Sequence, residues 1–293
     1  MDLLLQLIAN GLVNGALFAL LACAFGLVYR SVRVFHIAFA GLFLISPYAA
    51  YAANVWLQMP IWFAILLGVA VGGVAGYLIE QFLYHPFFRR KASPMAVMLA
   101  SLGAFIIIEN VLAVIFGNEL RTFDRDLAPS FALGQISLTS IQIFQFVAAT
   151  SVLAVLALAI RRVRVFKAIW AMGDEPGLLP VLGLPLSRYR KIVFTLSATL
   201  GGLAGCLIAV DVGVDPHMGM SYLLIAAVAM LAGGADRYAG WILGGVTLAF
   251  LQSVMVWQFS AKWMDFVTFT VLIGVLMFRP QGMLGLRKRL EEN

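Results

Sequence analysis

Long apolar runs separated by short polar segments dominate the chain. Each run is about 20 residues long, which at 1.5 Å per helical residue matches the hydrocarbon thickness of a bilayer. Backbone amides in hydrocarbon are satisfied only in helices or closed barrels, and these runs are far longer than the roughly 10-residue alternating strands of a barrel. We therefore predict an all-α polytopic transmembrane helical bundle with spans near 3–28, 35–54, 61–83, 94–116, 140–160, 192–212, 238–258 and 264–278.

One further apolar stretch is shorter. It runs from Tyr222 to Leu231 and is followed by Gly233 and Gly234. Even when it is extended to Ala235 it is barely long enough to cross a bilayer, so it predicts either a short spanning helix or a re-entrant one. The bundle should therefore contain eight to nine helical segments.

Basic residues follow every second predicted span. They cluster at Arg30 and Arg33, at Arg89, Arg90 and Lys91, and at Arg161, Arg162, Arg164, Lys167, Arg188, Arg190 and Lys191. The intervening loops carry mainly the acids Glu119, Asp124, Asp126, Asp211 and Asp215. The positive-inside rule places the amino terminus outside and the basic loops in the cytoplasm, and Arg279, Arg287, Lys288 and Arg289 place the carboxyl terminus there too. Ends on opposite sides require an odd number of crossings, which favours nine segments.

Composition supports the same class of protein. With 62% hydrophobic and 12% charged residues, the chain lacks the polar surface of a water-soluble protein of its size. The formal net charge of +6 does not indicate nucleic-acid binding, because the basic residues lie at the ends of spans and not in one patch. Cys23 and Cys206 lie inside apolar runs, which favours packing over redox or metal chemistry. No nucleophile or metal constellation is visible, so no enzyme activity is expected.

The largest predicted cytoplasmic loop, 161–191, has an apolar middle. Asp174 is suited to cap a short helix with Pro176 in its first turn, and Gly183 to close it, although Pro180 is awkward inside. The residues assigned to this coupling helix are Asp174, Glu175, Pro176, Gly177, Leu178, Leu179, Leu182 and Gly183. Its exposed leucines suit docking into a groove of another protein, and a helix that rests on lipid is the alternative.

A path for a polar solute needs polar side chains that face the bundle interior, because polar groups turned to lipid are costly. Asn10 and Asn14 lie one turn apart near the outer end of the first span, where their amides can face one lumen and bind a zwitterion or an amide. A hydrogen bond between helices explains them equally well. His36, at the cytoplasmic start of the second span, is a weaker candidate because such histidines usually have a local partner.

Three residues inside the second span, Ser46, Pro47 and Tyr48, mark an irregularity. Proline removes a backbone donor and frees the carbonyl four residues earlier. The sequence therefore predicts either a broken helix that lines part of the path, with Ser46 and Tyr48 as candidate contacts, or a simple kink.

Two polar residues lie inside other spans. Glu109 is a carboxylate deep in a span and would suit a proton-coupled carrier, but no second acid or histidine is expected at its depth, so a hydrogen bond to a neighbouring helix is favoured. Gln252 is also expected to pack, with solute contact as the alternative. Small residues recur at four-residue spacing, for example at Gly11 and Gly15 and at Gly240 and Gly244, which favours close helix packing within the chain over self-dimerisation.

Four strings of the sequence resemble the permeases of branched-chain amino-acid ABC importers, in collinear order over nearly the whole chain. They are NGLVNGALFALLACAFGLVYRSVRVFHIAFAG (10–41), the loop 166–184, AGGADRYAGWILGG (232–245) and FRPQGMLG (278–285). The resemblance implies one transmembrane permease domain, 1–293, in the bacterial inner membrane. It also implies a second, similar permease as partner, two ATPase subunits at the cytoplasmic face, with 166–184 as the coupling segment of this chain, and an external solute-binding protein.

The resemblance further implies ATP-driven alternating access for a small amino-acid-like solute. The chain has no GxxxxGK[ST] loop, so ATP and magnesium would be used by the partner subunits, and no cofactor is expected on this chain. It departs from the family at 36–40, where HIAFA replaces the usual Asn-Phe-Ala-His-Gly, and at Lys167 and Trp170, where arginines are usual. The solute therefore stays open among branched-chain amino acids, amides and urea. The alternatives are an autonomous secondary transporter and a passive channel.

Overall fold

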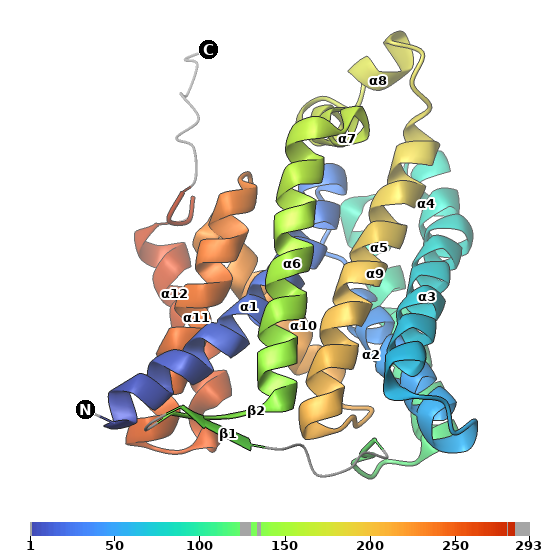
Figure 1. Ribbon diagram of the computed structural model, residues 1–293. Helices are drawn as coiled ribbons and strands as arrows, with labels where there is room; N and C mark the ends of the chain where they lie inside the picture. The colour runs from blue at the N-terminus through green and yellow to red at the C-terminus, as the bar shows by residue number, and fades with distance from the viewer. Residues whose placement is uncertain (1, 124–129, 134–135, 280, 285–293) are drawn as a thin grey trace.

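The computed structural model describes residues 2–123, 130–133, 136–279 and 281–284. The charged residues Asp124, Asp126, Arg287, Lys288 and Arg289, which entered the orientation argument, lie outside the described residues. Within the described part, the chain is a bundle of helices with one small hairpin at its edge (Figure 1). The predicted all-α class is confirmed.

Within the described residues, nine apolar helices form the bundle and run alternately up and down (Figure 1). They are α1 (Asp2–Val32), α2 (Phe39–Tyr51), α3 (Ile61–Ile79), α5 (Pro94–Phe116), α6 (Ser140–Arg162), α9 (Leu186–Val212), α10 (Met218–Gly233), α11 (Tyr238–Gln258) and α12 (Met264–Phe278). Six helical stretches are long and apolar enough to cross a membrane, while α10 and α12 are shorter. The short stretch at 222–231 is thus part of a helix that begins four residues earlier, at Met218.

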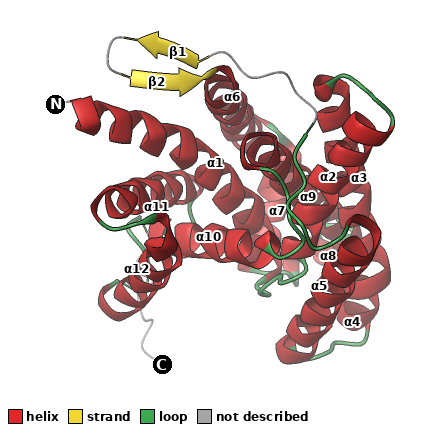
Figure 2. Cartoon of the chain, turned by 90° about the horizontal axis from the view of Figure 1, so that it is seen from below, coloured by secondary structure: helices red, strands yellow, loops and turns green. Residues whose placement is uncertain are grey.

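The bundle is built around α1, whose apolar window is 89% buried. Viewed from below, α1 lies between α11 on one side and α6 on the other (Figure 2). Gly11 and Gly15 allow the contact with α11, because a Cβ added to them would lie 2.8 Å from the Phe250 ring and 3.2 Å from the Val246 backbone. Packing within the chain, the use predicted for these glycines, is confirmed.

Two helices begin inside the bundle and not at its ends. The backbone N–H groups of Ile37 and Ala38, just before α2, donate to the Ser101 hydroxyl in the second turn of α5, at 2.7 and 3.2 Å. The start of α10 lies against α2, since a Cβ at Gly219 would be 2.8 Å from the Ala40 carbonyl oxygen. Non-helical backbone at this depth is tolerated because it is enclosed by protein.

The second helix is not broken at Pro47, as one interpretation of the sequence had it. α2 continues through Pro47, and a π-helical turn at Ala52–Trp56 follows it. The carbonyl that Pro47 frees belongs to Phe43. It lies so close to α9 that a Cβ at Gly205 would be 2.7 Å from its oxygen, so the freed carbonyl is covered by α9.

The two ends of the bundle differ in structure. A hairpin of β1 (Ser130–Leu133) and β2 (Ile136–Thr139) lies beside the start of α1, where the Gln6 amide bonds the Ser137 backbone at 3.0 and 2.9 Å. At the opposite end lie α7 (Arg164–Asp174), α8 (Leu178–Val181) and the end of α12 (Figure 1). The start of α1 and the end of α12 are therefore at opposite ends, as an odd number of crossings requires.

A buried ion pair joins α3 to α9. α3 continues through a π-helical turn, Glu80–Tyr84, into α4 (His85–Arg89). The Glu80 side chain is completely buried, and its carboxylate accepts a hydrogen bond from the Arg190 guanidinium at 3.3 Å. Arg190 also lies over the Phe88 ring at 4.5 Å. Sequence reasoning took Arg190 only as a loop cation, so it missed this pair.

Candidate functional site

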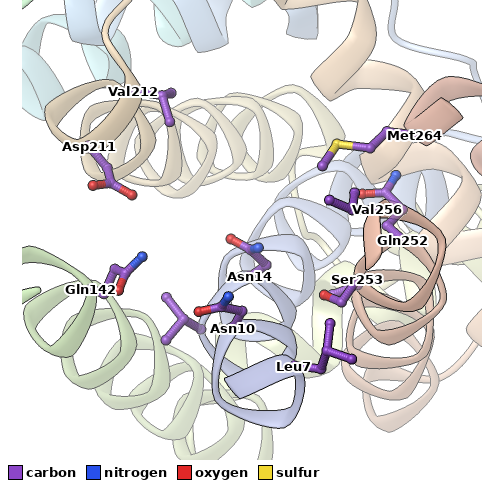
Figure 3. A pocket seen from close by; sticks show the side chains of 12 residues that line it. Leu7, Asn10, Asn14, Gln142, Asp211, Val212, Gln252, Ser253, Val256 and Met264 are labelled. Carbon is purple, nitrogen blue, oxygen red and sulfur yellow. The ribbon is translucent and has the colours of Figure 1, made fainter. Parts of the chain in front are cut away.

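A cavity of about 300 Å³ opens near the hairpin end of the bundle. It lies between α1, α6, α9, α11 and the start of α12 (Figure 3). Its polar lining residues are Asn10, Asn14, Gln142, Asp211, Gln252 and Ser253. Its apolar lining residues are Leu7, Val13, Val212, Ala249, Val256 and Met264.

Asn10 and Asn14 share this cavity because they occupy successive turns of one face of α1. The glycine pair Gly11 and Gly15 occupies the neighbouring face and packs on α11. In Figure 3 both asparagine side chains point into the space shared with Gln142 and Asp211. Asn10 also accepts a hydrogen bond from the Gln6 amide at 3.1 Å. The structure therefore places both side chains where one lumen was predicted.

Gln252 lines the same cavity and also holds α12 in place. Its side-chain amide donates to the Thr268 hydroxyl at 2.7 Å, and the side chain is buried. Thr268 in turn donates to the Met264 carbonyl at 3.0 Å. The two interpretations of Gln252, packing and solute contact, are thus both compatible with its position.

Asp211 is the cavity residue that the sequence analysis counted among the loop acids, although the predicted span 192–212 includes it. It lies in the last turn of α9, and its carboxylate points toward Gln142 and Asn14 (Figure 3). It is the one ionisable side chain in the lining, all of which lies in the described part of the chain. A carboxylate beside amides and aliphatic groups is suited to bind an ammonium group.

Three other path candidates lie away from this cavity. His36 is buried, and its Nδ1 lies 2.6 Å from the Tyr84 hydroxyl. Ser46 is enclosed between α3 and α9, because its hydroxyl fills the space that a Cβ at Gly72 or Gly202 would occupy. The Tyr48 ring packs on Phe116 with centroids 4.6 Å apart. The structure brings none of these three to the cavity.

Glu109 has a partner that the sequence did not reveal. Its carboxylate lies 2.8 Å from Nδ1 of His217, just before α10, so the expectation that no histidine shares its depth is wrong. The two residues are 108 positions apart in the chain, and only the fold brings them together. The Glu109 side chain is 20% exposed and the His217 side chain 63% exposed.

The predicted coupling helix is a helix pair. Asp174 ends α7 and does not begin a helix, and α8 is a four-residue turn of helix at Leu178–Val181. Leu179 is buried in the core, contrary to the predicted exposed surface, while Val181 and Leu182 are 81% and 69% exposed. Gly183 adopts φ +72 and reverses the chain toward α9, as expected for a closing glycine. The side chain of Leu178 lies outside the described residues.

The end of α7 is tied to the rest of the bundle by arginine. The Arg30 guanidinium, at the end of α1, donates to Asp174 at 2.5 Å and lies 3.4 Å from Asp236. Arg33 donates to the same Asp236 at 3.0 Å. Asp236 belongs to the turn between α10 and α11, so these residues connect the end of α7 to three helices of the core.

The sequence model of the family described as "Branched-chain amino acid transport system / permease component" matches residues 7–276 of this chain. The chain is 28% identical over 295 residues to the high-affinity branched-chain amino acid transport system permease protein BraD of Pseudomonas aeruginosa, covering 96% of this chain and 95% of the relative. It is 25% identical to LivH of Escherichia coli, a permease protein of the same kind of system, with the same coverage.

The chain is also similar to a permease of a different import system and to one solved structure. The autoinducer 2 import system permease protein LsrC of Yersinia pseudotuberculosis is 27% identical over 258 residues, covering 85% of this chain and 69% of the relative. Among solved structures, PsaBC from Streptococcus pneumoniae in complex with Fab superposes with a TM-score of 0.55 at 12% identity, covering 93% of this chain and 91% of that chain. At this identity the structural similarity concerns the fold alone.

Proposed function

Since the chain belongs to the permease family of branched-chain amino acid transport systems, we propose that it is the permease subunit of an ATP-driven importer for a small amino-acid-like solute. The cavity lined by Asn10, Asn14 and Asp211 is the observation that carries this proposal. It places polar groups inside a bundle whose surroundings are apolar, which is expensive in a membrane unless a polar solute uses them.

The chemistry of the cavity fits an amino acid. The Asp211 carboxylate would bind the ammonium group, and the amides of Asn10 and Asn14 would donate to the carboxylate of the solute. Val212, Val256 and Met264 would contact an aliphatic side chain. A volume of about 300 Å³ lies at the small end of the range for ligand sites, which favours a solute of this size over a peptide.

The proposed orientation puts the cavity outside and the helix pair α7–α8 inside the cell. Arg30, Arg33, the cations at the end of α4 and those of 161–191 all belong to the α7–α8 end of the bundle. The positive-inside rule assigns that end to the cytoplasm. The cavity then faces the side from which an external binding protein would deliver solute.

The helix pair is the proposed docking site for the ATPase subunits. Val181 and Leu182 extend from it as exposed apolar side chains at the cytoplasmic end. Burying them in a groove of a partner would contribute to binding by removing apolar surface from water. ATP and magnesium would act in those partner subunits.

The α5 face that carries Glu109 is the proposed contact with a second permease. Ile106 is exposed and Ala113 half-exposed, one turn before and one turn after Glu109 on the same side of α5, as expected for lipid or for a protein partner. His217 and Glu109 are also partly exposed beside them, and charged or polar groups directed at lipid are costly. A second permease, identical or similar, would cover this pair.

Reconstituted uptake tests the proposal. We expect the chain, purified with its associated subunits and placed in proteoliposomes, to hydrolyse ATP faster when a candidate solute and its binding protein are added. Replacing Asn10 and Asn14 with leucine should impair uptake without impairing assembly, and Leu182→Asp should abolish ATP-dependent uptake while the chain stays in the membrane. Uptake driven by a proton gradient without ATP would instead identify a secondary carrier that uses Glu109 and His217.

A further inference from the structure

An open groove of about 450 Å³ runs along the outside of α9 where it packs on α3. It is lined by Tyr77, Arg188, Lys191, Ile192, Thr195, Leu196 and Thr199. Neither the family match nor the proposed transport mechanism assigns it a role. It lies away from the solute cavity, which no residue of this groove lines.

One end of the groove is charged, and the rest of its lining is mainly apolar. Its α9 residues recur every three or four positions from Arg188 to Thr199, so they form one stripe along the helix. At 1.5 Å per residue this stripe is roughly 16 Å long, about the depth of one leaflet of a hydrocarbon core of about 30 Å. Below the two cations, the lining consists of aliphatic, aromatic and threonine side chains, and the Thr199 hydroxyl is already bonded to the Thr195 carbonyl at 2.8 Å.

The charges at the mouth of the groove are available to an anion. The Lys191 ammonium lies 5.3 Å from the centroid of the Tyr77 ring, which positions it over the groove. The nearby Glu80 carboxylate is paired with Arg190. Among the described residues, neither Arg188 nor Lys191 forms an ion pair with a carboxylate.

We propose that this groove binds an anionic phospholipid of the cytoplasmic leaflet, with its phosphate between Arg188 and Lys191 and one acyl chain along Ile192, Thr195, Leu196 and Thr199. Two cations above an apolar groove match the phosphate and the acyl chain of such a lipid. A protein partner would have to supply acids to the same two cations. The cytoplasmic assignment rests on the proposed orientation, whereas lipid binding can be measured without any transport.

Native mass spectrometry of the full chain in mild detergent tests the site. Phosphatidylglycerol and phosphatidylcholine would be titrated against the wild type, the double variant R188S/K191S, and the control R161S/R162S, which removes two exposed cations from the same end of the bundle. We expect the wild type to prefer phosphatidylglycerol. The loss of two cations should weaken phosphatidylglycerol binding on the order of thirtyfold, and the control variant should change it less than threefold.

A second measurement separates the contribution of the two cations to lipid binding from that of the apolar groove. Thr195→Phe should fill the groove and weaken phosphatidylglycerol binding with both cations intact, and a photoreactive residue at 195 should cross-link to lipid in native membranes. Equal affinity for the two lipids, unchanged binding by R188S/K191S, an equal loss in the control, or a cross-link to a polypeptide would each overturn the proposal. Loss of lipid binding with intact uptake would leave the transport function standing, so the two proposals can fail separately.

Discussion

Asp211 occupies a position that helix electrostatics disfavours. It lies in the last turn of α9, next to Gly213, whose φ of +89 follows the helix end. A carboxylate near the carboxyl end of a helix faces the negative end of the dipole, which costs about 0.3–1 kcal/mol. A favourable interaction with a solute would offset this cost, so position and proposed role agree.

Replacing Asp211 with asparagine should therefore reduce transport without reducing the stability of the protein. We expect the unfolding midpoint to stay unchanged or rise slightly, because the unfavourable charge is removed. Solute affinity in uptake assays should fall about tenfold to a hundredfold, since a hydrogen bond to a charged group contributes about 1.5–3 kcal/mol. Asp265→Asn is the matched control: Asp265 is exposed in the first turn of α12, the favourable end of that dipole, so stability should fall slightly and uptake should not change. Normal uptake by the Asp211 variant would contradict its role.

At the scale of helices, the bundle depends on backbone-to-backbone contact at glycine. α10 and α11 pack closely where Gly244 meets the Ala229 carbonyl and the Gly233 N–H. A Cβ at Gly244 would lie 2.7 Å from the Gly233 nitrogen and would overlap the Ala229 carbonyl oxygen. Backbone atoms of a neighbouring helix cannot rotate away as a flexible side chain can. This contact therefore fixes the distance between the two helices.

Gly244→Ala and Gly103→Ala should have opposite effects on stability. The first should lower the free energy of unfolding by about 1–3 kcal/mol, because the added methyl group overpacks a rigid contact. At Gly103, in the middle of α5, an added Cβ meets nothing within 4 Å. That substitution should be neutral or raise stability by about 0.5–1 kcal/mol, since alanine favours helix more than glycine does. The check is thermal unfolding of both variants in the same detergent, and equal destabilisation would refute the packing argument.

At the scale of the whole molecule, Arg30 is the junction between α7 and the core. Its side chain is 6% exposed and pairs with Asp174 at the end of α7 and with Asp236 of the α10–α11 turn. α1, which ends beside it, carries Asn10 and Asn14 at its other end. A movement of α7 would thus be passed directly to the helix that lines the cavity.

Arg30→Gln should uncouple the assembled transporter. ATP hydrolysis should continue while solute uptake falls severalfold, because the ion pair between α7 and α1 is lost. Arg33→Gln is the control: Arg33 is 41% exposed, shares Asp236 and reaches α7 only through a long bond of 3.4 Å to the Gly173 carbonyl, so its loss should have a smaller effect. The measurement is the ratio of solute moved to ATP hydrolysed in proteoliposomes. An unchanged ratio in the Arg30 variant would show that Arg30 does not couple α7 to the core.

The sequence predicted the spans well because lipid imposes both length and apolarity on them. The run 94–116 coincides with α5. The run 3–28 ends four residues before α1 does, because the last residues of that helix are mainly polar and hydropathy does not detect them. Asp211 was missed as a cavity residue for the same reason: it lies at the end of the predicted span 192–212, and as an acid it was counted with the loop. The buried side chains of α7, Phe166, Ile169 and Met172, recur every three residues and would have revealed that helix.

Contacts between distant residues could not be predicted in this way. Nothing near Glu109 in the sequence indicates His217, and nothing near Arg30 indicates Asp236. These pairs depend on how the helices are arranged, which the length and apolarity of each run do not determine. The cavity itself was anticipated through Asn10 and Asn14, which belong to one helix, and through Gln252 as an alternative to packing, but nothing in the sequence indicated that the three residues share one cavity.

The pair of Glu80 and Arg190 has a consequence for biogenesis. A chain that grows from its amino terminus delivers Glu80 to the translocon 110 residues before Arg190 is synthesised. Arg190 lies in the second turn of α9, between the cations Arg188 and Lys191 at the α7–α8 end, so Glu80 waits for its partner near the headgroups and not at the bilayer centre, where an unpaired carboxylate would cost about 2.5–3.5 kcal/mol. The third segment can therefore complete its packing against the sixth only after Arg190 has been synthesised.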